Sequence, residues 1–148
     1  MTGETLLILN GPGNPTNSDL QKIEAACVER CNALSVKLDF RQANAEEEVH
    51  RRIVRDSDNY DALIVSPSAG ALGGNVGYEA CRAAIEAIMH LNKPVIEVHI
   101  ENMFRSEVQS LRPLQVPEGG LGLVCGLGVK GYLLAIDATY RQLMSRAA

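Results

Sequence analysis

Short apolar runs alternate with longer segments of helical periodicity along this chain, and that alternation restricts the fold more than any other feature. Each apolar run ends in a polar or glycine-rich stretch, as strands do when a loop follows. The expected strands are residues 5–9, 35–40, 61–65, 94–100 and 121–125. Four helices are expected between and after them. The first starts at Asn17 or Ser18, the second follows a cap at Asn44, and the other two span residues 78–91 and 129–146. This order predicts an α/β fold with three layers, in which helices cover both faces of a five-stranded parallel sheet.

Composition restricts the class of protein further. A chain of 148 residues with a net charge of -4 and no basic block fits one soluble domain that binds no nucleic acid. No apolar run approaches the roughly 18 residues of a membrane span, and Met1-Thr2-Gly3-Glu4 lacks the basic start of a signal peptide, so we expect a cytoplasmic location. The four cysteines form no CxxC pair, which favours buried thiols over a metal site or disulfides.

The turns after the first four strands are expected to meet at one edge of the sheet. They supply residues 10–17, Gln42 and Asn44, residues 66–75 and residues 97–102. Glycines and helix N-termini gathered at such an edge favour a small anion as ligand. The glycine-rich stretch 70–75 resembles a phosphate loop in composition only, because it lacks the Lys-Ser/Thr ending of that motif. We therefore expect no nucleotide, flavin or other cofactor.

The fourth expected strand carries the chemistry most typical of an active site. Alternation along it places Glu97, His99 and Glu101 on one face and apolar residues on the other. A histidine at the carboxyl edge of a parallel sheet can move a proton near neutral pH, and a neighbouring carboxylate can set its tautomer. The spacing is equally consistent with a histidine that satisfies a backbone group at a strand end. If the catalytic interpretation holds, the imidazole and the earlier turns should share one solvent-facing cleft.

Five blocks of the sequence carry a family resemblance. They are Leu6–Pro12, Phe40–Glu46, Asp61–Pro67, Pro94–Asn102 and Val124–Tyr132. In this order they resemble the type II dehydroquinases, the flavodoxin-like 3-dehydroquinate dehydratases of the shikimate and quinate pathways. The resemblance implies a sheet order of 2-1-3-4-5, a dodecamer built from trimers, and a lyase reaction that removes water from 3-dehydroquinate through an enolate.

The resemblance also implies roles for particular residues. His99 matches the family's general acid and Glu97 the carboxylate that orients it, while the amides of Ile100 and Glu101 match the site for the substrate carboxylate. The other substrate-binding positions of the family are kept less well. Ser66 stands where the family has an asparagine, and Asn14 lies one residue past Gly13, which replaces another asparagine. Arg105 lies one position before the family's first arginine of the following segment, and Arg112 is a candidate for the second. Asn10 and Asn75 are further candidates to complete the pocket.

The chain departs from the family at the base. The family's lid after the first strand carries a tyrosine base and an arginine, but no Tyr or Arg lies between Asn10 and Lys22. Tyr78, at the expected start of a helix, is a candidate replacement base, or else a partly buried helix residue. The sequence thus predicts a dehydratase acting on a small hydroxylated cyclic carboxylate by a route other than the usual tyrosine base. The alternative is a non-catalytic protein that binds a small carboxylate or assembles on the same scaffold as a homo-oligomer.

Overall fold

A five-stranded parallel sheet forms the middle of the structure, a computed structural model that describes residues 3–11, 17–44, 46–66, 93–100 and 122–147. Its strand order is β2-β1-β3-β4-β5, and every neighbouring pair is parallel. Both the predicted parallel sheet and the order implied by the resemblance are confirmed. The strands are β1 (Thr5–Asn10), β2 (Lys37–Gln42), β3 (Ala62–Ser66), β4 (Val95–His99) and β5 (Gly122–Cys125).

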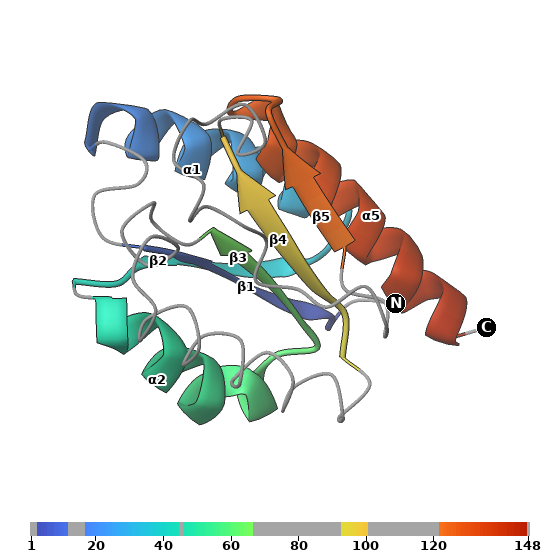
Figure 1. Cartoon of the computed structure of the whole chain (residues 1–148). Coiled ribbons are helices and arrows are strands. Elements are labelled where there is room, and N and C mark those ends of the chain that lie inside the picture. The colour runs from blue at the N-terminus through green and yellow to red at the C-terminus, as the bar shows by residue number, and fades with distance from the viewer. Residues whose placement is uncertain (1–2, 12–16, 45, 67–92, 101–121, 148) are drawn as a thin grey trace.

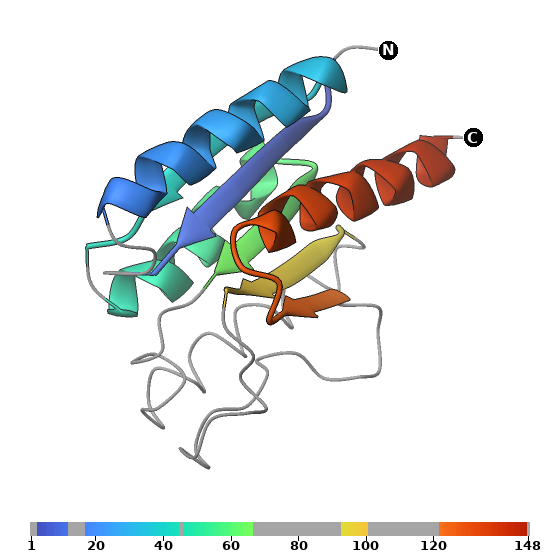
Figure 2. The ribbon, with the colours of Figure 1, turned by 90° about the horizontal axis from the view of Figure 1, so that it is seen from above.

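Helices cover the sheet on both sides. The helices α1 (Asn17–Ala33) and α5 (Lys130–Ala147) lie side by side over one face, as Figures 1 and 2 show. The helix α2 (Glu46–Asp56), followed by the short helix η1 (Ser57–Asn59), lies over the other face. The predicted helix at 78–91 falls outside the described residues. None of the described helices combines the length and apolar character that crossing a bilayer requires.

Two apolar clusters, one on each face of the sheet, hold the layers together. Because side chains alternate along a strand, even-numbered residues of β1, β3 and β4 pack against α1 and α5, and odd-numbered residues pack toward α2. The α1/α5 face includes Leu6, Ile8, Ala62, Ile64, Ile96 and Val98, and the α2 face includes Leu7, Leu9, Leu63, Val65 and Val95. A polar residue at the end of one of these strands therefore lies on the α1/α5 face if its number is even and on the α2 face if its number is odd.

The second strand starts later than predicted, because the turn that ends α1 includes the first residues expected in that strand. Ser35, expected as the first strand residue, has a φ of 59° and belongs to the turn that closes the helix. Val36 N–H donates to Cys31 O (2.9 Å) and Ser35 N–H to Asn32 O (3.2 Å), which is the Schellman pattern of a helix C-terminus. β2 therefore starts two residues later than predicted and continues to Gln42.

Polar side chains also correct two other boundaries. Asp61, expected as the first residue of the third strand, instead accepts hydrogen bonds from the backbone N–H of Thr5 (2.8 Å) and its hydroxyl (3.0 Å). At the start of α2, the bond observed at Asn44 comes from its backbone N–H, which donates to the Glu48 carboxylate (2.8 Å). This bond, together with the ion pair to Arg52, lowers the pKa of Glu48.

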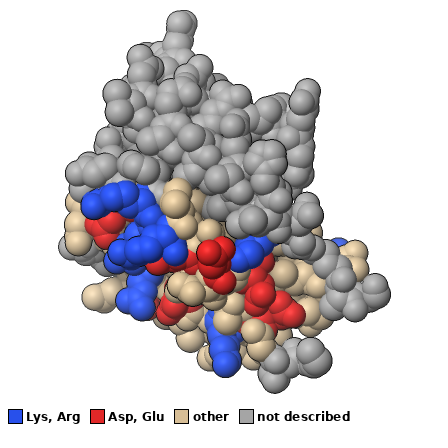
Figure 3. Space-filling view, turned by 90° about the horizontal axis from the view of Figure 1, so that it is seen from below, with Lys and Arg blue, Asp and Glu red and all other residues tan. Residues whose placement is uncertain are grey.

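Charges on the α2 side are mixed in sign. Figure 3 shows acidic and basic side chains interspersed there, with no single-sign patch among the residues it colours by charge. Several are paired: Arg52 with Glu48 (2.8 Å), Arg55 with Asp56 (2.9 Å) and Arg41 with Asp39 (3.6 Å). These exposed or half-exposed pairs contribute little stability each, so the core clusters carry most of it.

The cysteines follow the prediction only in part. Cys27 and Cys31 are buried free thiols, and burial raises their pKa to about 12 and about 11, so both remain neutral at physiological pH. Cys125 is only partly buried, because β5 is an edge strand. Cys81 lies outside the described residues.

The left-handed residue at the end of α1 yields a stability prediction. Ser35→Gly should raise the free energy of unfolding by about 0.5–1 kcal/mol, since glycine adopts positive φ without the steric cost that a Cβ imposes. Urea unfolding measures this difference. Ser35→Ala is the matched control, because it removes the hydroxyl but keeps the Cβ and should bring no gain. A glycine variant no more stable than the alanine variant would contradict this account of the turn.

Candidate active site

The carboxyl end of β4 holds a buried histidine–carboxylate pair. His99 Nε2 is hydrogen-bonded to a Glu97 carboxylate oxygen, and the two residues are 7% and 0% exposed. Both are odd-numbered on β4, so both lie on the α2 face, which confirms the predicted shared face. Among the described residues, the hydrogen-bond partner observed for the ring is this carboxylate. The arrangement fixes the ring orientation.

A glycine turn holds the chain just beyond this pair. Gly126 N–H donates to His99 O (3.2 Å), and Gly128 N–H donates to Ile100 O (3.0 Å). Both glycines have positive φ, 79° and 61°, which lets the chain leave β5, fold back over the end of β4 and enter α5. The backbone at Ile100, which the resemblance implies in carboxylate binding, is thereby held in place from its carbonyl side. The His99 ring is also buried, which differs from the solvent-facing position predicted for it.

A second polar group lies at the same edge but on the α1/α5 face. Asn10 ends β1, Ser66 ends β3, and each is 0% exposed. Tyr132, in the first turn of α5, is also 0% exposed and donates its hydroxyl to Asn10 Oδ1 (2.7 Å). Asn10 Nδ2 in turn donates to Arg41 O (3.1 Å). The Ser66 hydroxyl has no partner of regular hydrogen-bond geometry among the described residues.

The predicted site residues are thus divided between the two faces of the sheet. His99 and Glu97 lie on the α2 face, whereas Asn10 and Ser66 lie beneath α5. Asn10 and Ser66 are buried, so the described structure presents neither as an open contact surface for a ligand. The other predicted site residues lie outside the described residues: Asn14, Asn75, Tyr78, Glu101, Arg105 and Arg112.

Tyr132 was missed as a site residue by reasoning from the sequence. The signal that points to it is its place at the end of the Val124–Tyr132 block, one residue after a glycine. A Cβ at Gly131 would approach Val124 Cγ1 to 3.3 Å and Val98 Cγ1 to 3.4 Å, so glycine allows α5 to come close to β4 and β5. That close approach brings the Tyr132 hydroxyl to Asn10.

Burial affects the chemistry of the described tyrosines. Desolvation raises the pKa of Tyr132 to about 12, although the nearby Ser66 hydroxyl acts in the opposite direction. Desolvation and a hydrogen bond to Asp39 likewise raise the pKa of Tyr60 to about 12. Neither phenol is therefore suited to act as a base near neutral pH.

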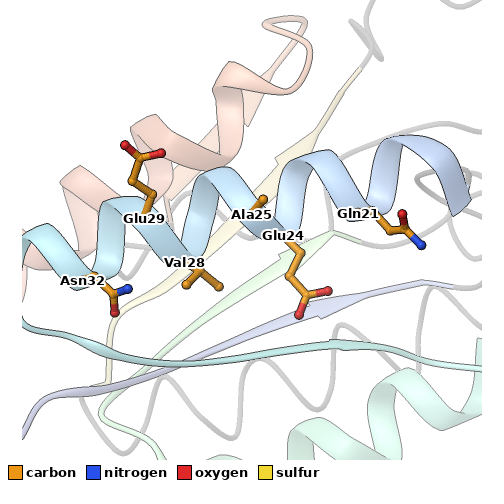
Figure 4. A pocket seen from close by; sticks show the side chains of 6 residues that line it. All are labelled: Gln21, Glu24, Ala25, Val28, Glu29 and Asn32. Atoms are coloured by element: carbon orange, nitrogen blue, oxygen red, sulfur yellow. The ribbon is translucent and has the colours of Figure 1, made fainter.

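Two hollows lined by described residues lie away from His99. One runs along α1 and is lined by Gln21, Glu24, Ala25, Val28, Glu29 and Asn32, as Figure 4 shows. Its two glutamates make it unsuited to a carboxylate ligand. The other is an apolar crevice of roughly 200 Å³ between α1 and α5, with Lys22 and Lys130 at its rim. Within the described residues, no group of three or more His, Cys, Asp or Glu side chains is arranged to hold a metal ion.

A parallel sheet of order 2-1-3-4-5 with a histidine–carboxylate pair at its carboxyl edge defines a small flavodoxin-like α/β protein. Comparison with known proteins then identifies the family to which it belongs. The family model described as "Dehydroquinase class II" matches residues 5–140. The chain belongs to this family.

Individual relatives agree with that assignment. A 3-dehydroquinate dehydratase of Photobacterium profundum is 32% identical over 143 residues, covering 96% of this chain and 89% of the relative. One from Clostridium botulinum is 26% identical and covers 94% and 96%. A type II dehydroquinase structure from Propionibacterium acnes superposes with a TM-score of 0.75 at 26% identity, covering 94% and 99%. A "3-Dehydroquinate Dehydratase-like Protein" from Bifidobacterium longum has a TM-score of 0.72 at 25% identity, covering 96% and 99%. The named relatives are carbon–oxygen lyases.

The buried pair can be tested by removing the carboxylate. Glu97→Ala should lower the free energy of unfolding by about 1–3 kcal/mol, because it leaves the enclosed His99 ring without its acceptor. Glu97→Gln keeps an acceptor oxygen and should lose less. Urea unfolding gives both values, and the ¹⁵N shifts of His99 report whether Nε2 carries the proton in the wild type. Equal stability of all three proteins would show that the pair does not hold the ring.

Proposed function

We propose that this protein is a dehydratase that eliminates water from a small hydroxylated cyclic carboxylate, and that 3-dehydroquinate is its substrate. The observation that carries the proposal is the His99–Glu97 pair at the carboxyl edge of the sheet. His99 acts as general acid on the leaving hydroxyl, and Glu97 orients the ring. Family membership and the names of the relatives support the substrate class.

The substrate carboxylate binds to backbone amides just past His99 in this proposal. Ile100 and Glu101 supply them, and the bond from Gly128 N–H to Ile100 O supports the idea that this backbone is preorganised. Asn14, Asn75, Arg105 and Arg112 are retained as substrate-binding candidates on the sequence resemblance alone.

Proton abstraction requires a base other than the one the family resemblance implies, because no Tyr or Arg lies between Asn10 and Lys22. Tyr60 and Tyr132 are excluded by their raised pKa and their hydrogen bonds. Tyr140 lies about 15 Å along α5 from Lys130, at 1.5 Å per residue, and so is far from the carboxyl edge. Tyr78 is the remaining tyrosine of the chain, and we assign the base to it.

Turnover of 3-dehydroquinate tests these roles, followed through the ultraviolet absorbance of the conjugated product. His99→Ala should lower kcat/KM by about 10²–10⁴-fold, the usual contribution of a general acid. Tyr78→Phe should cause a loss of similar size, whereas Tyr140→Phe, the matched control, should leave turnover unchanged. Full activity of the His99 variant would contradict the assignment of the acid. Full activity of the Tyr78 variant would contradict the assignment of the base alone.

A second candidate function follows from the missing tyrosine and arginine: a non-catalytic protein that binds a small carboxylate. Thermal shift with quinate, shikimate or citrate separates the two candidates when combined with the assay. A ligand at 100 times its Kd should stabilise the fold by about 2.7 kcal/mol. Binding without turnover favours the carboxylate-binding protein, and turnover favours the dehydratase. Absence of both would contradict each proposal. The trimer-based dodecamer that the resemblance implies remains part of either proposal.

A further inference from the structure

Three buried polar side chains lie beneath the edge of the sheet, on the face opposite His99. We propose that Tyr132 is a positioning residue: through Asn10 it fixes the points where the chain leaves β1 and β2, and so orders the substrate-binding side of the site without touching substrate. The inference rests on the proposed function only for its effect on turnover. Its structural part concerns the described residues alone.

The amide group of Asn10 is occupied within the protein. Its Oδ1 accepts from the Tyr132 hydroxyl (2.7 Å), and its Nδ2 donates to Arg41 O (3.1 Å). Asn10 is also 0% exposed. One N–H and one lone pair of the amide are not used by these two bonds, but the residue is fully buried, so a ligand could reach it only by displacing the groups that cover it. Asn10 is thus suited to support the edge rather than to contact substrate.

Backbone hydrogen bonds extend from Asn10 to the ends of three strands. Ala43 N–H donates to Asn10 O (2.8 Å), just past the end of β2. Gly11 N–H donates to Ser66 O (2.8 Å), and the Gln42 side chain donates to Gly11 O (3.2 Å). The Asn10 side chain is thus bonded to β2 through Arg41 O, and the backbone of Asn10 and Gly11 connects the exit of β1 to the exits of β2 and β3. The exit of β1 leads to Asn14, a substrate-binding candidate.

Tyr132 is well placed to be the fixed member of this group. It belongs to a rigid helix, and Gly131 lets that helix lie against β4 and β5. Its ring packs in the core of the α1/α5 face, with the Phe40 ring centroid 6.5 Å away. Burial keeps the phenol protonated, so it remains a hydrogen-bond donor at every physiological pH.

The separation of the two faces predicts which kinetic constant changes. His99 and Glu97 have their own hydrogen bond on the α2 face, whereas Tyr132 and Asn10 bond to each other and to Arg41 O on the opposite face. Loss of the Tyr132 hydroxyl should therefore weaken substrate binding more than the chemical step. In kinetic terms KM rises while kcat stays nearly constant, and the pH profile of kcat does not move.

Amide hydrogen exchange of Tyr132→Phe tests the structural part without any substrate. Exchange at Gly11 and Ala43 should become faster by on the order of tenfold relative to the core amides of β3. Thr139→Val is the matched control: it removes one buried, unpartnered hydroxyl from the same helix and should leave both amides unchanged. Equal exchange at Gly11 and Ala43 in both variants would overturn the proposal. If Tyr132→Phe does not fold, the exchange rate of the Tyr132 hydroxyl proton in the wild type decides: slow exchange supports the bond to Asn10, and fast exchange overturns it.

Kinetics with 3-dehydroquinate test the functional part. Tyr132→Phe should raise KM on the order of tenfold with kcat within about twofold of wild type, and Thr139→Val should change neither. Failure of the proposed function would appear as a wild type without turnover, which leaves the exchange result standing. Failure of this inference would appear as an active wild type with an equally active Tyr132 variant. A loss confined to kcat would also overturn it.

Discussion

The alternation of side chains along parallel strands is the constraint on which the rest of this structure depends. Glu97 and His99 share a face of the sheet because every second residue of a strand lies on the same side. The same rule sends Asn10 and Ser66 to the opposite face, under α5. A shift of one residue in β4 would turn the imidazole into the apolar packing beneath α5 and separate it from its present environment.

Burial makes the two polar groups costly unless each is bonded. A carboxylate that is 0% exposed, as Glu97 is, loses its hydration and needs partners that restore it. Its bond to His99 supplies one such partner, and the turn at Gly126 and Gly128 keeps the histidine backbone from moving away. The sheet edge thus carries a bonded polar pair on each face, His99 with Glu97 and Asn10 with Tyr132, and each pair is held in one geometry.

Much of the fold could be predicted from the sequence, because the strand runs and helical stripes recur in a regular order. The shared face of Glu97 and His99 followed from alternation alone. Ser35 could not be placed, because nothing in its side chain signals a left-handed turn that glycine usually fills. The division of the site could not be seen either: β1 and β3 are apolar on both faces, so their hydrophobic pattern does not tell which helix layer Asn10 and Ser66 approach. Tyr132 was not predicted as a site residue because its hydrogen-bond partner, Asn10, is 122 residues away in the sequence.

Magnitudes decide what the His99–Glu97 pair can accomplish. A general acid contributes about 10²–10⁴-fold, far less than the whole acceleration of a typical enzyme, so the acid alone does not make an efficient dehydratase. The remainder must come from a base and from stabilisation of the enolate, each worth factors of similar size. The segment after β1 lacks the family's tyrosine and arginine, and the phenols of Tyr60 and Tyr132, whose pKa values are raised to about 12, stay protonated near neutral pH and cannot abstract a proton in their place. Efficient catalysis by this chain therefore requires that the side of the site opposite His99 supply a base of its own, whereas a carboxylate-binding protein needs only the preorganised backbone past β4.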